Sequence, residues 1–188
     1  MSAGVPLPDR DRKFYDTADI IAIRDAVRAL AAVVIPRAHL VWGGQPAITP
    51  LIRYVLERMN TVVKAHVTLY QSNFFRKFFP DDNLMFEDVR IVKELGDRET
   101  SLLQMRREML AREHKYVAGI FIGGMEGIID EFNLFSELHP SAVVILVAST
   151  GAAARMLYDQ YPGEKDQRLL DDYAYMALFK DLLFKYIN

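Results

Sequence analysis

Short, uniformly apolar runs alternate along the chain with longer segments in which apolar residues recur every three or four positions. The short runs predict strands, because a strand that is buried on both faces shows no polar alternation. The predicted strands are residues 39–42, 65–70, 88–95, 117–122 and 142–148. Three of these runs lead directly into a glycine pair or a Ser-Thr-Gly turn, after which a helical pattern begins.

The longer segments predict helices at residues 18–35, 51–59, 101–114, 125–138, 149–160 and 166–187. Thr17 is expected to cap the first of these helices, and Pro50 suits the first turn of the second. Ser101 and Gln104 have the spacing of a capping box at the start of the third helix. Strand and helix patterns therefore alternate over most of the chain.

This alternation predicts an α/β fold in which a mainly parallel sheet is covered by helices on both faces. A three-layer, Rossmann-like arrangement is the expected architecture. No internal repeat, low-complexity tract or flexible linker divides the sequence, so residues 1–188 are expected to form a single domain. In such sheets, ligands bind beyond the carboxyl ends of the strands.

Several turns are expected to meet at that edge of the sheet. A glycine pair lets the backbone approach an anion, and a following helix presents free N–H groups with a favourable dipole. Gln71 and Ser72 also follow a predicted strand and could bond a ligand. Tight turns use glycine for conformational reasons alone as well, and that alternative stays open for each turn. The candidate turns are Gly43-Gly44, Gly123-Gly124 and Ser149-Thr150-Gly151.

The turn at Gly123 and Gly124 has informative neighbours. On a helix that begins near Met125, the residues Gly127, Asp130 and Glu131 share one face. Gly127 keeps this face open, so that Glu131 could reach a ligand in the turn, and Met125 is a further ligand-binding candidate. The alternative is a pair of solvated carboxylates near a helix start.

Arg106 and Arg107 lie on the preceding predicted helix. They could form surface ion pairs with Glu108 and Glu113, which is the usual role of such residues. The functional alternative is that one arginine reaches a ligand phosphate.

Charge and composition exclude several classes of protein. The 23 basic and 25 acidic residues give a net charge of −2, which argues against a binder of duplex nucleic acid. Cysteine is absent, and the four histidines have no metal-binding spacing, so neither a metal nor a cofactor is predicted. The sequence contains no Walker A motif and no Gly-x-Ser-x-Gly elbow. No apolar run approaches 18 residues and no signal peptide is evident, so a cytoplasmic location is expected.

Two further segments contain more aromatic or apolar residues than a surface segment of a monomer needs. The aromatic segment at residues 73–80 could stack on a base or cover a pocket, or it could pack on the core or on a partner subunit. The predicted helix at residues 166–187 is apolar around most of its circumference, whereas the outer helix of a monomer needs only one apolar stripe. A homodimer or higher homo-oligomer is therefore expected, with this helix at the interface.

The segment SLLQMRREMLAREHKYVAGIFIGGMEGIIDEF resembles the signature region of the SLOG superfamily, which includes the Lonely Guy phosphoribohydrolases and DprA-type proteins. Arg106 matches the arginine that those hydrolases use in substrate binding and catalysis. Glu131 matches their glutamate, and Gly123, Gly124 and Gly127 match their glycines. The sequence departs from the hydrolase pattern in three ways: Ile122 replaces a proline, one extra residue separates the glycines, and Ile128 replaces a phosphate-binding threonine.

Further blocks between residues 39 and 155 resemble a bacterial branch of SLOG-type proteins. The resemblance implies a strand before the loop at residues 2–10, yet this sequence starts almost on that loop, so the strand is either truncated or supplied differently. The resemblance also implies that a nucleotide-derived ligand is bound or sensed. Two alternatives remain. One is an N-glycoside hydrolase in which Glu131 and Arg106 are catalytic, and the other is a structural or partner-binding domain.

Overall fold

The computed structural model describes residues 1–59 and 65–187 and confirms the Rossmann-like α/β class. Six strands form two three-stranded sheets, in the orders β1-β5-β6 and β2-β3-β4, and every pairing is parallel. The strands are β1 (Ser2–Gly4), β2 (Leu40–Trp42), β3 (Val67–Ser72), β4 (Asp88–Val92), β5 (Ala118–Gly123) and β6 (Val143–Val147).

The two sheets meet where β1 lies beside β2. The backbone nitrogen of Met1 donates a hydrogen bond to the carbonyl of Val41 over 2.8 Å, which connects the start of β1 to β2. The chain continues from β1 into the β2-β3-β4 sheet and later returns to β5 on the other side of β1. The strand order therefore reverses at β1, and this topological switch point is where α/β sheets usually bind ligands.

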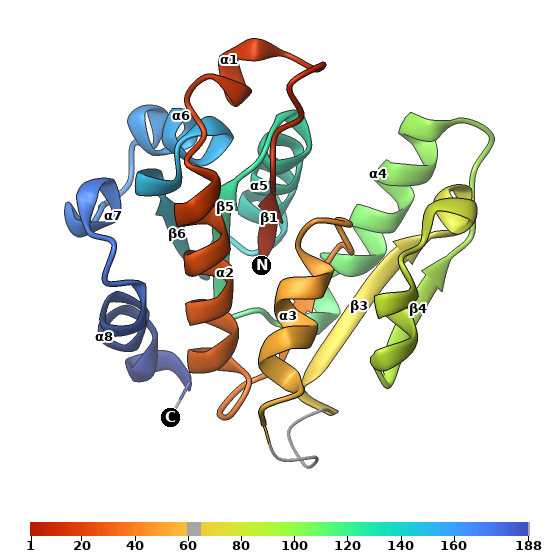
Figure 1. The fold of residues 1–188 in the computed structure, drawn as a ribbon, viewed down its shortest axis with the longest axis horizontal. Helices are drawn as coiled ribbons and strands as arrows, with labels where there is room; N and C mark the ends of the chain where they lie inside the picture. The colour runs from red at the N-terminus through yellow and green to blue at the C-terminus, as the bar shows by residue number, and fades with distance from the viewer. Residues whose placement is uncertain (60–64, 188) are drawn as a thin grey trace.

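Two groups of helices cover the strands. Helix α2 packs against α3 and α8, and α2 crosses in front of β5 and β6 in Figure 1. Helix α5 packs against α4 and α6. The longer helices are α2 (Ile20–Val34), α3 (Thr49–Leu56), α4 (Arg98–Met109), α5 (Glu126–Leu138), α6 (Ala152–Gln160) and α8 (Tyr175–Ile187). Two short helices, α1 (Arg12–Tyr15) and α7 (Arg168–Asp171), lie in the connections.

The strand β1 was missed by the sequence patterns, which treated residues 2–10 as a loop. Ser2, Ala3 and Gly4 are all buried and pair in register with β5, with Gly4 opposite Gly123. These three small residues lack the β-branched or aromatic side chains that mark a strand in sequence. The strand that the family resemblance implies is therefore present within the chain.

Both predicted capping residues proved wrong. The N-cap of α2 is Asp19, whose carboxylate accepts from the N–H of Ala22 over 2.8 Å, whereas the Thr17 hydroxyl donates to the carbonyl of Lys13. Helix α4 begins earlier than predicted, with Asp97 as its N-cap. Ser101 is consequently buried within the helix. Asp competes with Ser and Thr for N-cap positions, and the apolar pattern alone did not separate them.

The predicted terminal helix at residues 166–187 is divided into α7 and α8. Helix α8 packs against α2 through one apolar face, formed by Tyr175, Leu178, Phe179, Leu183 and Ile187. Outside that face, Met176 remains 44% exposed and Tyr186 40% exposed. Part of the apolar excess is thus explained by packing within the chain. Within the described ranges, no helix is both long and apolar enough to cross a membrane.

Candidate functional site

A cavity of about 860 Å³ opens at the carboxyl ends of β1, β2, β3 and β5. It therefore lies at the edge of the sheet that the sequence pattern favoured for a ligand. The predicted residues that line it are Gly43, Gly44, Gln71, Ser72, Arg106, Gly124, Met125, Gly127 and Glu131. Residues from four separate segments of the chain are thus brought to one cavity.

The turn at Ser149, Thr150 and Gly151 is directed into the fold and does not line this cavity. The Ser149 hydroxyl lies 2.9 Å from that of Tyr175, and Thr150 Oγ1 accepts from the N–H of Gly123 over 2.9 Å. A Cβ at Gly151 would collide with the backbone of Thr17. These contacts assign the three residues a packing role in this conformation.

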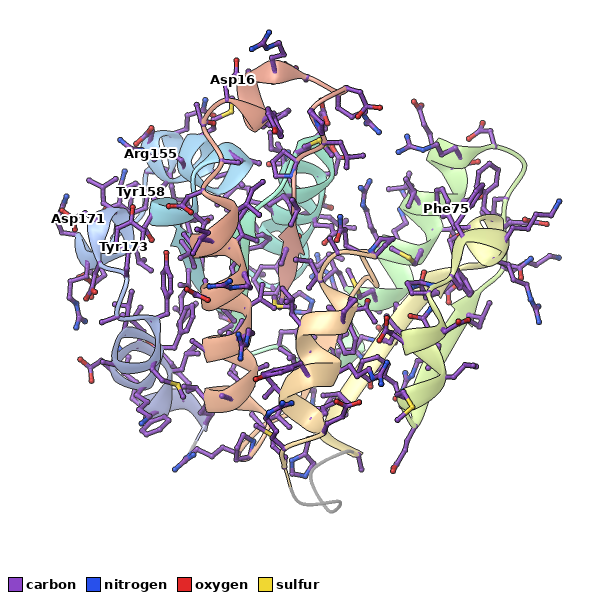
Figure 2. The ribbon with its side chains drawn as sticks, viewed as in Figure 1. Asp16, Phe75, Arg155, Tyr158, Asp171 and Tyr173 are labelled. Atoms are coloured by element: carbon purple, nitrogen blue, oxygen red, sulfur yellow. The ribbon has the colours of Figure 1, made fainter. Side chains whose placement is uncertain are left out.

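Arg155, which follows that turn, also lies away from the cavity. Its Nε donates to both carboxylate oxygens of Asp159 at 3.0 Å, one turn further along α6. Figure 2 shows Arg155 on the opposite side of the molecule from Phe75, which lines the cavity.

Gly123 and Gly124 hold the turn in place through their own N–H groups. Gly123 donates to Thr150, and Gly124 donates to the carbonyl of Gly4 over 2.8 Å. Both have positive φ, +56° and +77°, which glycine adopts without steric cost. Because these N–H groups are already bonded, they are not available to a ligand in this conformation.

The open N–H groups lie one step further along the chain. Met125 is the N-cap of α5 and its side chain makes no capping hydrogen bond. The N–H groups of Met125, Glu126 and Gly127 have no acceptor within residues 1–59 and 65–187. All three residues line the cavity, so the positive end of the α5 dipole faces it with donors free to bind an anion.

Arg106 bridges α4 and α5 at the side of this helix start. Its Nη1 lies 3.0 Å from Asp130 Oδ2 and its Nε lies 3.4 Å from Glu131 Oε1. The side chains of Arg106 and Glu131 are only 12% and 14% exposed, whereas that of Asp130 is 57% exposed. A Cβ at Gly127 would lie 2.9 Å from Arg106 Nη2, so this glycine makes room for the guanidinium. The surface network with Glu108 and Glu113 is not the one that Arg106 forms.

Gln71 positions the turn at Gly43 and Gly44. Its Nε2 donates to the carbonyl of Gly44 over 3.0 Å, and Gln71 is 5% exposed. Gly44 has a φ of +63°, and a Cβ there would collide with the Gln71 amide. Ser72 is buried, and its Oγ accepts from the N–H of Phe74 at the start of the aromatic segment.

The aromatic segment closes one side of the cavity. Phe75, Phe78 and Phe79 all line it, and Phe78 is 75% exposed. This placement brings the rings to the ligand side of the sheet, where they can stack on a flat group. Trp42 also lines the cavity but is 2% exposed and packs edge-on against Phe86, so its main contacts are in the core.

Sequence reasoning missed other residues of the cavity. Gly4 and Ser2 enter it from β1, and the Ser2 hydroxyl is buried without a hydrogen-bond partner in the described structure. Arg10 and Arg98 also line it. A glycine after two small residues is a weak sequence signal for a ligand-binding position. Only the pairing of β1 with β5 shows that Gly4 lies at the cavity.

The charged lining is mixed in sign. Arg10, Arg98 and Arg106 face four carboxylates, those of Glu99, Glu126, Asp130 and Glu131. Such a lining suits a ligand that is partly anionic and partly rich in hydroxyl groups, since N–H dipoles bind phosphates and carboxylates accept bonds from ribose hydroxyls. Among the residues that the structure describes, no group of three or more acidic or histidine side chains could hold a metal ion.

Comparison with known proteins identifies one family. The model of the SLOG cluster3 family matches residues 13–183, which is most of the chain. No curated protein matches the chain.

Proposed function

The chain belongs to the SLOG cluster3 family of nucleotide-related Rossmann-like domains, and we propose that it binds a nucleotide or nucleotide-derived ligand in the cavity at the switch point. The observation that carries the proposal is the start of α5. Three backbone donors, at Met125, Glu126 and Gly127, have no acceptor among the described residues and face a cavity that also contains Arg106. A phosphate group at this position would gain several N–H bonds and the helix dipole.

The rest of the cavity fits the other parts of such a ligand. Asp130 and Glu131 lie next to the proposed phosphate position and can accept bonds from ribose hydroxyls. Phe75, Phe78 and Phe79 supply aromatic faces for a base. A phosphate that approached Arg106 would compete with the two carboxylates for its guanidinium. Binding should therefore be accompanied by rearrangement of this ion pair.

The experiment is a thermal-shift and calorimetric titration with nucleoside mono-, di- and triphosphates, NAD and cyclic ADP-ribose-type compounds. At least one of them should raise the melting temperature through ligand-linked stabilisation. Arg106→Ala should reduce that rise, and Arg155→Ala should preserve it, because Arg155 pairs with Asp159 outside the cavity. If no compound shifts the melting temperature, the ligand-binding proposal fails and the structural or partner-binding alternative is favoured.

A second candidate function is hydrolysis of an N-glycosidic bond. The observation in its favour is the Glu131–Arg106 pair, in which a carboxylate with little exposure is held beside the proposed ribose position. Glu131 would stabilise positive charge that develops on the sugar or would activate water. Ile128 is buried against Gly124 and offers no hydroxyl to a phosphate, which favours binding over turnover.

Base release from the same compounds tests this second candidate. Glu131→Gln and Asp130→Asn form a matched pair, because both residues accept a bond from Arg106 and each substitution removes one charge. Hydrolysis that depends on Glu131 should be lost in Glu131→Gln and retained in Asp130→Asn. Turnover that survives Glu131→Gln would exclude this catalytic assignment, and binding with no base release would leave the sensing function.

We propose in addition that the chain forms a homo-oligomer through the exposed side of α7 and α8. Tyr173 is 58% exposed, and Met176 and Tyr186 are also exposed beside the face that packs on α2. Light scattering coupled to gel filtration tests this. Met176→Glu should shift the protein towards the monomer, and a monomeric wild-type protein would contradict the proposal.

A further inference from the structure

A second cavity, of about 580 Å³, lies at the opposite edge of the sheets. It is lined by the residues that begin β2, by Val117 and Ala118 at the start of β5, and by the end of α8. Among the described residues, Met1 is the only one that lines both this cavity and the one at the switch point. The two cavities are therefore separate sites.

The lining of the second cavity has one sign of charge. Arg37, Arg90 and Lys115 contribute three cations, and His39 and His114 add two imidazoles. No carboxylate lines the cavity within the described ranges. This concentration of basic groups is notable in a chain whose net charge is −2. Arg90 is paired with Asp88, which does not line the cavity, so the excess positive charge rests on Arg37 and Lys115 and favours binding of anions.

Two of the cations lack acidic partners in the part of the chain that the structure describes. Arg37 and Lys115 form no ion pair there, and the Arg37 guanidinium lies 4.5 Å from the centre of the Phe184 ring. Stacking on Phe184 orients the guanidinium plane while its N–H groups remain available. Lys115 has a φ of +49°, a backbone conformation uncommon for a residue with a side chain.

Arg90 is held at the cavity by a network of hydrogen bonds. Its guanidinium donates to Asp88 at 3.2 and 3.3 Å and to the Tyr70 hydroxyl at 3.0 Å. Thr68 donates to the same Asp88 carboxylate over 2.6 Å. Thr68 and Tyr70 are 2% and 4% exposed, so the network rests on buried positions of β3. Arg90 is thereby fixed in place before any ligand arrives.

The histidines extend this network on both sides. His39 Nε2 lies 2.6 Å from Thr68 Oγ1, and because that hydroxyl donates its proton to Asp88, it must accept from His39. His114 Nε2 lies 3.2 Å from the Tyr70 hydroxyl. Donors from the residue before β2, from β4 and from the segment before β5 are consequently held around one cavity. Tyr116 and Tyr186 add aromatic surface to its wall.

We propose that this cavity is a second binding site, for the phosphate group of a phosphorylated small molecule. Arg90 and Lys115 provide charged donors, and Arg37 provides a planar guanidinium suited to two phosphate oxygens. The tyrosines would pack against the organic part of the ligand. This site does not depend on the nucleotide site, because its donors and its location are different.

Inorganic pyrophosphate is the probe for this proposal, and amide chemical shifts report where it binds. In the full chain carrying Arg106→Ala, which weakens the switch-point cavity, saturable shifts are expected at His39, Lys115 and Arg90. The double variant Arg37→Gln with Lys115→Asn should weaken binding by about tenfold, since two charged donors are lost. Both positions are exposed, and Asn tolerates the backbone conformation of Lys115, so the fold should be kept.

Arg112→Gln is the matched control. Arg112 precedes Lys115 by one short turn, carries the same charge and lines neither cavity. Its replacement should leave the affinity within about twofold, in line with the small effect of an exposed surface charge. Shifts confined to residues 124–127, no saturable shifts at all, or equal affinity in the double variant would each overturn the proposal.

Discussion

The Nε atom of Arg106 lies 3.4 Å from the Glu131 carboxylate, although the two residues belong to different helices. Both side chains are largely buried, and Gly127 leaves the space that the guanidinium occupies. The pair couples α4 to the first turns of α5, next to the N–H groups of that helix that have no partner in residues 1–59 and 65–187. It joins the proposed phosphate position to the proposed ribose position.

Arg106→Ala should weaken binding of an anionic nucleotide by at least about tenfold, because a largely buried charged donor is lost and two carboxylates are left unopposed. Calorimetric titration of the ligand identified in the screen measures the change. Arg155→Ala removes the same charge outside the cavity and should leave the dissociation constant unchanged. Equal loss in both variants would point to a non-specific charge effect.

Gly127→Ala should lower the affinity for the ligand without lowering the free energy of unfolding. Alanine is favoured over glycine inside a helix by up to about 1 kcal/mol, so the free energy of unfolding should rise or stay constant. The added Cβ would lie 2.9 Å from Arg106 Nη2 and displace the guanidinium, so ligand affinity should fall. Urea unfolding and ligand titration of one preparation measure both quantities. Unchanged affinity would show that the position of Arg106 does not matter for the ligand.

Gly44→Ala should lower the free energy of unfolding by about 1–3 kcal/mol, because a left-handed backbone strains alanine and the Cβ meets the Gln71 amide. Gly96→Ala is the control: its φ is +66°, yet a Cβ there meets nothing within 4 Å. Only the backbone strain is then expected. Chemical denaturation of both variants measures the difference, and equal destabilisation would mean that the contact with Gln71 contributes nothing.

The pKa of His39 should lie below its usual value of 6.5, mainly because of partial burial, with His66 and Arg90 also lowering it. Asp88 acts in the opposite direction, so Asp88→Asn should lower this pKa further. Because the folded state favours the neutral ring, the stability that His39 contributes is present above pH 6.5 and is lost as the pH falls through the folded pKa. Imidazole proton shifts followed against pH give both values. A pKa that rises in Asp88→Asn would contradict the network.

The hydrogen bonds that Asp88 accepts from Thr68 and Arg90 also change the pKa of the Asp88 carboxyl. Partial burial acts to raise the pKa of Asp88, but the hydrogen bonds from Thr68 and Arg90 together with the charge of Arg90 outweigh it, so the pKa is lowered. Its carboxylate therefore stays ionised at neutral pH and keeps the second cavity's network intact. Protonation of Asp88 should loosen Arg90 only under acidic conditions.

The apolar runs predicted five of the six strands, because uniform hydrophobicity over a few residues is a local property. The strand β1 escaped detection since Ser2, Ala3 and Gly4 have no strand-forming side chains. Its position is specified by the register with β5. The helix caps were missed for a related reason: Asp19 and Thr17 are both acceptable caps, but Thr17 bonds back to the carbonyl of Lys13 and Asp19 caps α2.

For the cavity, the sequence by itself determined the residue types and the turns at which they occur. The spacing of Gly127 and Glu131 on one helix face follows from helical periodicity, and Arg106 was identifiable by resemblance. Only the tertiary structure decided which backbone N–H groups remain open. Gly4 and Thr150 come from distant parts of the chain and accept the hydrogen bonds of Gly124 and Gly123, respectively. The proposed anion position is therefore at the next N–H groups, those of Met125, Glu126 and Gly127. Hydrogen bonds between distant segments depend on how the strands assemble, and no local pattern encodes that assembly.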